Sequence, residues 1–224
     1  MPISDNRRPY TILFDLDGTL IDSTEAILES FARSFEILGG EVPDVEVIKA
    51  QVGHPLADMY RKLGVPEERI DDYVRTYKEN YRQVHTQKTV LLPGAEAAVK
   101  KAAEFARLGI VTTKTGLYSQ ELMEHFGLME YFDVLIGSED VTRHKPHPEP
   151  ILSALKRMGC PPKGCWMIGD TCMDLEAARR AGIEGIGLLC GYGKEEDLRR
   201  CGERLAPDAL SAVTLIAQTP VEPS

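Results

Sequence analysis

The sequence predicts an α/β protein: a Rossmann-like core with a mostly parallel sheet, into which an all-helical cap subdomain is inserted. Five short apolar runs each end in polar or glycine residues, which is typical of buried strands that lead into loops. Helical stretches lie between these runs, and this alternation is typical of a parallel sheet covered by helices. Residues 24–88 interrupt the alternation because they show helical periodicity and no convincing strand.

The expected elements follow in chain order. The expected strands are residues 10–14, 108–113, 133–138, 165–169 and 185–190. The expected core helices are residues 95–107, 118–126, 149–158 and 175–181, and the expected cap helices are residues 26–38, 56–63 and 67–84. Residues 20–23 should form the hinge, with Asp22 and Ser23 capping the first cap helix. The assignments that follow are residues 1–20 and 91–224 for the core, residues 21–90 for the cap, and a frayed tail over residues 219–224.

Charge and composition exclude several classes of partner. The 224 residues include 26 Lys and Arg against 35 Asp and Glu, a formal net charge of −9, which opposes attraction to nucleic acid or an anionic membrane. The chain has no run of about twenty apolar residues and begins without an apolar signal segment. We therefore expect a cytoplasmic protein with no nucleic-acid and no membrane partner. Its oligomeric state stays open, because the sequence does not distinguish helix faces that pack against another subunit from helix faces that pack in the core.

The five cysteines are odd in number and show no C-x-x-C spacing. This pattern predicts neither a complete disulfide framework nor a zinc site. We expect reduced thiols, as in most cytoplasmic proteins.

Two pairs of aspartates follow expected strands. Asp15 and Asp17 follow the first strand, and residues two apart in an extended backbone point to the same side. Asp170 and Asp174 follow the fourth strand. Carboxylates so close together favour binding of a cation, and Mg²⁺ prefers oxygen ligands. Asp170 can reach the same ion as the first pair. Asp174 can bind that ion through a water molecule, or hold its direct ligands in place. The simpler alternatives are a solvated acidic turn for the first pair and helix N-capping by Asp174.

Two further strand ends carry groups suited to a phosphoryl anion. Thr112 ends the second strand, and its hydroxyl and the nearby backbone N–H groups can hold phosphoryl oxygens. Lys145 follows the third strand and can supply a point charge to a nucleophile and to a transferring phosphoryl group. A strand-end threonine and a surface lysine are each ordinary features, so the prediction depends on all four strand ends together.

The order of these features resembles the haloacid dehalogenase superfamily of phosphohydrolases. The resembling segments are FDLDGTL (residues 14–20), VTTK (111–114), KPHPEP (145–150) and GDTCMDLEAARRAG (169–182). The position of the helical insert is similar to that in phosphoglycolate phosphatase-like members, and residues 133–181 are similar to PpaX-type pyrophosphatases. Thr113, a further candidate for phosphate binding, stands where many relatives have Asn, which leaves open how this loop contacts phosphate.

The resemblance implies a Mg²⁺-dependent phosphatase that forms an aspartyl-phosphate on Asp15. Asp17 would act as general acid and then as general base. Asp15, Asp170 and the backbone carbonyl of Asp17 would hold Mg²⁺. Thr112 and Lys145 would hold the phosphoryl oxygens.

The expected substrate is a small phosphorylated metabolite, because a cap that closes on the site leaves room for a small leaving group. Phosphoglycolate is the first candidate and pyrophosphate the second, while a phosphomutase resembling β-phosphoglucomutase would share every core residue. His54, in the VGHPL loop, is the candidate for contacting the substrate, or else an ordinary loop histidine. Asp17 argues against a dehalogenase, which needs no acid for its leaving halide, and against a non-catalytic binding module. A phosphorelay receiver fits poorly, because its phosphorylated aspartate lies mid-chain after a separate acidic pair.

Overall fold

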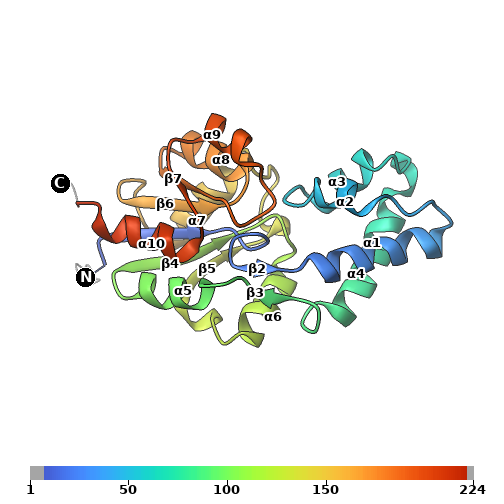
Figure 1. Ribbon diagram of the computed structural model, residues 1–224, viewed down its shortest axis with the longest axis horizontal. Coiled ribbons are helices and arrows are strands. Elements are labelled where there is room, and N and C mark those ends of the chain that lie inside the picture. Colours follow the sequence, from blue (N-terminus) through green and yellow to red (C-terminus); the bar gives the residue numbers. More distant parts are fainter. Residues whose placement is uncertain (1–7, 221–224) are drawn as a thin grey trace.

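The computed structural model describes residues 8–220, which form a larger α/β body with a smaller helical body beside it (Figure 1). Of the predicted tail, residues 221–224 lie outside the described residues. The Tyr10 hydroxyl donates to the carbonyl of Thr219, so the first strand of the sheet is joined to the end of the last helix. Among residues 8–220, no helix is both long and apolar enough to cross a membrane.

A six-stranded sheet forms the centre of the larger body. Its strands are β1 (Tyr10–Phe14), β4 (Ala106–Val111), β5 (Phe132–Ile136), β6 (Cys165–Gly169), β7 (Glu184–Leu188) and β8 (Leu205–Ala206). Every neighbouring pair is parallel, in the order β5-β4-β1-β6-β7-β8. The strand order reverses beside β1, which is where ligands bind in open α/β sheets. The predicted Rossmann-like core with a mostly parallel sheet is confirmed.

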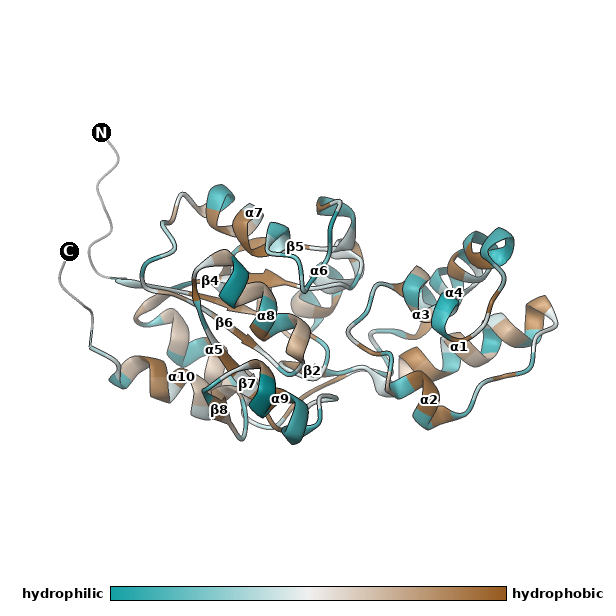
Figure 2. Ribbon diagram, turned by 90° about the horizontal axis from the view of Figure 1, so that it is seen from above, coloured by the Kyte–Doolittle hydropathy of each residue, from teal (hydrophilic) through white to brown (hydrophobic). Residues whose placement is uncertain are grey.

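Helices cover both faces of this sheet, because its strands are apolar on both sides. The core helices are α5 (Ala95–Ala103), α6 (Gly116–His125), α7 (Glu149–Met158), α8 (Cys172–Ala181), α9 (Glu195–Cys201) and α10 (Ala209–Gln218). Alternate residues of β1 point to opposite faces: Ile12 and Phe14 pack with α5 and α10, whereas Leu13 packs with α7 and α8. The strands are mostly brown in Figure 2, in keeping with burial on both faces.

The smaller body is the helical cap. It consists of α1 (Thr24–Leu38), α2 (Val45–Lys49), α3 (Leu56–Lys62) and α4 (Ile70–Val84), with a 3-10 turn at Glu67–Arg69. Aromatic rings fill its core, where Phe31 packs against Tyr60 and Tyr77 with ring centres 4.8 and 5.0 Å apart. The antiparallel strands β2 (Ile21–Asp22) and β3 (Val90–Leu91) lie where the chain passes between the two bodies. Tyr118 of α6 joins this aromatic cluster from the core, but most of its members belong to the smaller body. The cluster supports the division into core and cap, which stays our interpretation.

Several elements differ from those predicted. The helix predicted over residues 95–107 ends at Ala103, because residues 106 and 107 pair with β1 and belong to β4. The alanine-rich stretch favours helix locally, but the pairing of backbone groups with β1 overrides that propensity. The sequence patterns also missed β2, β3, α2, α9, β8 and α10. The first five are short, and α10 is mostly apolar, without the polar face that marks a surface helix.

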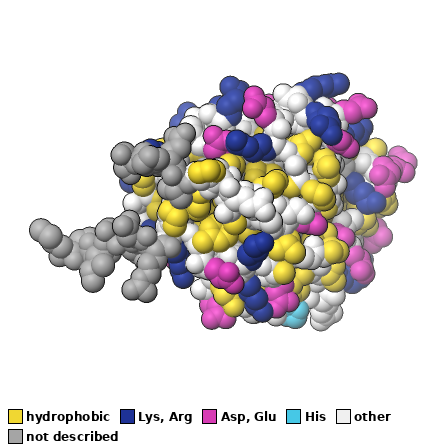
Figure 3. Space-filling view, turned by 60° about the vertical axis from the view of Figure 1, so that its left-hand side comes forward, with side chains coloured by type: hydrophobic (Ala, Val, Ile, Leu, Met, Phe, Trp, Pro, Cys, Tyr) yellow, Lys and Arg dark blue, Asp and Glu magenta, His cyan; other side chains and the backbone are white. Residues whose placement is uncertain are grey.

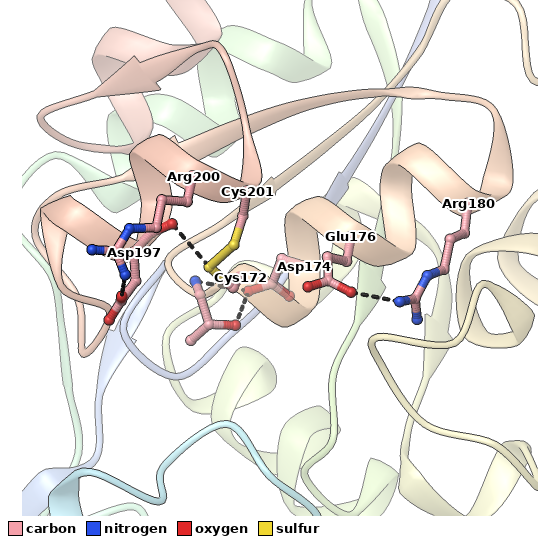
Figure 4. Close-up of a disulfide and its surroundings, with 8 residues drawn as sticks. Cys172, Asp174, Glu176, Arg180, Asp197, Arg200 and Cys201 are labelled. Carbon is pink, nitrogen blue, oxygen red and sulfur yellow. Dashed lines mark hydrogen bonds and ion pairs between the residues drawn. A yellow bond between two sulfur atoms is a disulfide. The ribbon is translucent and has the colours of Figure 1, made fainter.

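Cys172 and Cys201 form a disulfide that joins the first residue of α8 to the last residue of α9 (Figure 4). The expectation of reduced thiols is therefore wrong for this pair. The two residues are 29 positions apart, and the packing of α9 against α8 brings them together, so their spacing alone did not reveal the bond. Cys160, Cys165 and Cys190 are free thiols.

Charged side chains of both signs are interspersed on the face seen in Figure 3, with hydrophobic side chains between them. On this face the excess of acidic residues is not gathered into one patch. A polyanion would find no extended basic field there.

Candidate active site

The predicted site residues lie at the carboxyl ends of neighbouring strands. Asp15 follows β1, Thr112 follows β4 and Asp170 follows β6, while Lys145 lies in the loop between β5 and α7. Parallel strands end at the same edge of the sheet, so these loops converge. The structure therefore brings the four residues together beside β1, where the strand order reverses.

Three buried carboxylates, those of Asp15, Asp170 and Asp174, meet at this edge, with one oxygen of each within 4.8 Å of the others. Asp15 is 4% exposed, and the other two are fully buried. The Lys145 ammonium donates to Oδ1 of Asp15 at 2.9 Å, to Oδ1 of Asp174 at 2.5 Å and to the Val111 carbonyl at 3.0 Å. These acceptors use all three N–H donors of a lysine. To contact a phosphoryl oxygen, as predicted, Lys145 would have to give up one of these three acceptors. That contact stays a prediction.

The carboxylate trio carries more negative charge than its one lysine balances. Burial raises the pKa of Asp15 to about 6, with attraction by Lys145 opposing the rise and repulsion from Asp174 adding to it. Burial, and then repulsion from Asp15, raises the pKa of Asp170 well above its ordinary value. Burial alone would lower the pKa of Lys145, but the neighbouring carboxylates raise it. A divalent cation would relieve this imbalance, so the all-oxygen donor set fits Mg²⁺.

Backbone and side-chain donors hold Asp170 in place. Its Oδ1 accepts from the Thr19 hydroxyl at 3.2 Å, and its Oδ2 accepts from the backbone N–H of Tyr192 at 2.7 Å. Gly18 and Gly191 approach this carboxylate so closely that a Cβ on them would lie 2.3 and 2.2 Å from Oδ2. A larger residue at either position would displace the Asp170 carboxylate from the trio.

Asp174 belongs to the trio, and it is not the N-cap residue that the simpler alternative made it. α8 begins at Cys172 with Thr171 as its N-cap, and Asp174 is the third residue of the helix. Its Oδ2 accepts from the backbone N–H of Thr171 at 3.0 Å and from the hydroxyl at 2.7 Å, which is a capping-box arrangement (Figure 4). Its Oδ1 faces Lys145, so one carboxylate both starts the helix and joins the charged cluster.

Asp17 faces the cap rather than the trio. Its carboxylate accepts a hydrogen bond from the Ser23 hydroxyl and lies 3.1 Å from the Lys114 ammonium. Among the described residues, the carboxylate cluster does not include Asp17, so the predicted same-side orientation does not make its side chain a metal ligand. Ligation by its backbone carbonyl stays a prediction. Ser23 is the N-cap residue of α1, as predicted, but its side chain makes no cap hydrogen bond, whereas Asp22 accepts from the backbone N–H of Thr24 at 2.9 Å.

The two threonines after β4 have different surroundings. Thr112 is 5% exposed, and its hydroxyl accepts from the backbone N–H of Lys114 at 3.2 Å. It therefore lies at the turn of the strand-end loop, where its phosphate contact stays a prediction. The Thr113 hydroxyl donates to the carbonyl of Gly53 at 2.7 Å. This hydroxyl joins the core to the cap loop, and the phosphate contact of Thr113 stays a prediction.

A cavity of about 350 Å³ lies between the core and the cap. Asp17, Thr113 and Lys114 line it from the core, and His54 and Tyr81 line it from the cap. His54 is half-buried, its Nδ1 lies 3.0 Å from the backbone carbonyl three residues earlier, and burial lowers its pKa. The structure thus brings His54 into the same cavity as Asp17, and its contact with a substrate stays a prediction.

Two residues near the site, Lys114 and Tyr192, were not predicted from the sequence. Lys114 is the last residue of the VTTK segment, and a lysine so close to a strand end was a signal that could have been used. Tyr192 lies between two glycines in the loop after β7 and supports Asp170 through its backbone N–H. A backbone donor requires no particular side chain, so the sequence carried no such signal for Tyr192.

Comparison with known proteins identifies the family. The sequence pattern of the family described as haloacid dehalogenase-like hydrolase matches residues 12–188, from within β1 to the end of β7. The chain belongs to the haloacid dehalogenase-like hydrolase family.

Similar members of the haloacid dehalogenase-like family carry hydrolase and phosphatase names. Pyrophosphatase PpaX of Halalkalibacterium halodurans is 35% identical over 214 residues, which cover 93% of this chain and 98% of the relative. A phosphoglycolate phosphatase of Colwellia psychrerythraea is 29% identical over 215 residues, which cover 91% and 95%. The structure of a haloacid dehalogenase-like hydrolase from Streptococcus pneumoniae matches with a TM-score of 0.83 at 27% identity, over 92% of this chain and 97% of that one. The family resemblance predicted from the sequence is confirmed.

Proposed function

We propose that this haloacid dehalogenase-like hydrolase is a Mg²⁺-dependent phosphatase that cleaves a small phosphomonoester, with phosphoglycolate as the first candidate. The observation that carries the proposal is the position of Asp15. Its buried carboxylate lies 2.9 Å from the Lys145 ammonium, within the trio completed by Asp170 and Asp174. A nucleophilic carboxylate needs local positive charge of this kind to approach an anionic phosphoryl group.

The proposed Mg²⁺ would be held by Asp15, Asp170 and the backbone carbonyl of Asp17, with Asp174 supporting the cluster. A bound Mg²⁺ would offset the repulsion between the nucleophile and the phosphoryl oxygens. The raised pKa of Asp15 and of Asp170 supports this assignment, because buried carboxylates that resist ionisation gain most from a nearby cation.

The proposed reaction has two steps. In the first, a carboxylate oxygen of Asp15 attacks phosphorus, the bond to the leaving oxygen breaks, and Asp17 gives its proton to that oxygen. In the second, Asp17 takes a proton from water, the water oxygen attacks the phosphorus of the aspartyl-phosphate, and the Asp15 carboxylate leaves with the electron pair. The products are an alcohol and inorganic phosphate, and both aspartates return to their starting forms. The position of the Asp17 carboxylate in the cavity wall suits a group that acts on the leaving oxygen.

A small phosphorylated metabolite is the proposed partner. The cavity of about 350 Å³ between core and cap would accept a small leaving group. The net charge of −9 disfavours approach by long polyanions. The cytoplasmic location expected from the composition belongs to this proposal as well.

Pyrophosphate is the second candidate substrate, favoured by the 35% identity to PpaX. The same two steps would apply, with inorganic phosphate in place of the alcohol. A mutase like β-phosphoglucomutase would differ by returning the phosphoryl group to a sugar. Phosphate release from phosphoglycolate and pyrophosphate, with isomerisation of glucose 1-phosphate followed in parallel, separates the three activities.

Asp15→Asn tests the covalent mechanism. The amide is nearly isosteric with the carboxylate but is a poor nucleophile, so we expect phosphate release to fall roughly 1000-fold or more, as when a nucleophile is removed from other enzymes. Asp133→Asn, at an exposed position on β5, is the matched control, and circular dichroism checks the fold. Near wild-type turnover by Asp15→Asn would contradict the aspartyl-phosphate, and full activity in excess EDTA would contradict the metal.

A further inference from the structure

We propose that Lys114 selects substrates by the charge of the leaving group, so that the enzyme favours phosphates whose leaving group carries a second anionic group. This inference rests on the proposed phosphatase function and concerns the same cavity. It assigns to Lys114 a specificity-determining role, separate from the role of Lys145 beside the nucleophile.

The Lys114 ammonium lies where a leaving group must pass. It is 3.1 Å from Oδ2 of Asp17, the group proposed to protonate the leaving oxygen, and it lines the cavity between core and cap. The Lys114 side chain is only 9% exposed. A leaving group close enough to receive the Asp17 proton is therefore within a few bond lengths of a buried ammonium.

The cap holds this ammonium in position. Lys114 donates to the Tyr81 hydroxyl at 2.8 Å, and its Nζ lies 4.6 Å from the centre of the same ring. Tyr81 belongs to α4, whereas Lys114 follows β4 in the core. Among the described residues, Asp17 and Tyr81 are the two partners found for its three N–H donors, which leaves one donor for a ligand.

The buried ammonium of Lys114 can pair with a second anionic group. Within residues 8–220, Asp17 is the one carboxylate paired with this ammonium. Asp17 and Lys114 both line the cavity, so a leaving group beside the Asp17 carboxylate also lies beside this ammonium. A carboxylate or phosphate on the leaving group would accept a charge-assisted hydrogen bond from the remaining N–H donor, which a neutral group would do more weakly.

The other charged groups of the cavity leave this role to Lys114. Glu139 lies in the cavity wall, but its carboxylate oxygens accept from the backbone N–H of Gly116 at 3.0 Å. Two histidines also lie in the wall: His54 has a lowered pKa, which favours its neutral form, and Nε2 of His144 lies 3.0 Å from the carbonyl of Ser138. Lys78 also lines the cavity, and it provides a matched control because it is not one of the partners of Asp17 among the described residues.

The test compares two substrates that differ in one charge. They are phosphoglycolate and O-phosphoglycolamide, in which an uncharged amide replaces the carboxylate of the leaving group. The readout is the ratio of their kcat/KM values for phosphate release. For the wild type we expect a preference for phosphoglycolate of about 10- to 100-fold, the range for a hydrogen bond between charged groups. In Lys114→Met this ratio should fall toward one, whereas Lys78→Met should keep most of it.

The ratio separates specificity from positioning. If Lys114 served only to hold Asp17, Lys114→Met would slow both substrates equally and keep the ratio, which would overturn the proposal. If the ratio fell as much in Lys78→Met as in Lys114→Met, the proposal would also be overturned. The preference for phosphoglycolate would then come from the overall charge of the cavity and not from Lys114. The wild-type ratio needs no variant, and a value near one contradicts the role of Lys114 even if the variant does not fold. Absence of phosphate release from both compounds in the wild type would instead count against the proposed phosphatase function.

Discussion

The two aspartates of the first motif face different ammonium groups. Asp15 lies against Lys145 in the core, and Asp17 lies against Lys114 beside the cap. Two carboxylates only two positions apart thus have separate counter-ions and separate neighbours. In the proposed mechanism, this separation would let one of them attack phosphorus while the other exchanges a proton.

The raised pKa of Asp15 predicts how the stability of the metal-free protein depends on pH. The folded state raises this pKa from 3.8 to about 6, so the folded protein binds the proton more tightly than the unfolded chain. The resulting stabilisation is complete below about pH 4 and is lost as the pH rises through about 6, a difference of about 3 kcal/mol. Asp170, whose pKa is also raised, acts with the same sign.

The measurement is thermal unfolding between pH 4 and about pH 8, in EDTA and in Mg²⁺. Asp15→Asn removes this titrating group, so the difference in unfolding free energy between wild type and variant isolates Asp15 from the other carboxyl groups. In EDTA we expect the wild type to lose stability relative to the variant as the pH rises. In Mg²⁺ that loss should shrink, since metal binding favours the ionised carboxylate. A difference that stays flat with pH in EDTA would be inconsistent with a raised Asp15 pKa.

At the scale of elements, helix α8 connects the charged trio with the rest of the core. Its first residue, Cys172, is bonded to Cys201 at the end of α9, and its third, Asp174, belongs to the trio. The loop that leads into α9 supplies the backbone N–H of Tyr192 to Asp170. The disulfide therefore joins two segments that each position a carboxylate of the site.

Cys201→Ser should lower the free energy of unfolding by about 2–4 kcal/mol under oxidising conditions, the usual range for removal of one disulfide. It should also weaken stabilisation by Mg²⁺, because α9 and the loop before it become less constrained. Cys160→Ser, which changes a free thiol outside the pair, is the control. Denaturant unfolding measures both effects, and dithiothreitol should reproduce the loss in the wild type but not in Cys201→Ser. Unchanged stability of the wild type after complete reduction would refute a stabilising role for the bond.

At the scale of the whole molecule, four hydrogen bonds beyond the hinge join the helical cap to the core among the described residues. Thr113 donates to Gly53 at 2.7 Å, and Lys114 donates to Tyr81 at 2.8 Å. The third joins the hydroxyl of Thr24, at the start of α1, to that of Tyr192 at 2.8 Å. In the fourth, the Tyr118 hydroxyl of α6 donates to the carbonyl of Lys78 at 3.2 Å. A substrate too large for the cavity must break these contacts to reach Asp15.

We therefore expect a phosphoserine peptide to be a poor substrate. Four hydrogen bonds at about 1 kcal/mol each correspond to a kcat/KM roughly 1000-fold below that of a small phosphomonoester. Thr113→Val keeps the side-chain shape and removes one of these bonds. The ratio of kcat/KM for the small substrate to that for the peptide should therefore fall about fivefold. Phosphate release from both substrates measures the difference, with Thr214→Val on α10 as a control distant from the cap. Equal turnover of peptide and small substrate by the wild type would show that cap closure does not limit access.

The sequence by itself determined the fold class and the positions of Asp15, Thr112, Lys145 and Asp170. Apolar runs that end in polar residues identify the strands of a parallel sheet, and such strands end at one edge. Local pattern and topology are therefore enough to bring those four residues together.

Only the tertiary structure decided the contacts that surround these four residues. The pairing of Cys172 with Cys201, the hydrogen bond from Ser23 to Asp17 and the position of Lys114 against Tyr81 depend on how separate helices and loops pack. The distance between two side chains across such contacts is set by the packing of whole elements, which leaves no periodic trace in the chain. For the same reason the short elements α2 and α9 appeared only in the structure, since tertiary packing rather than local propensity stabilises helices of this length.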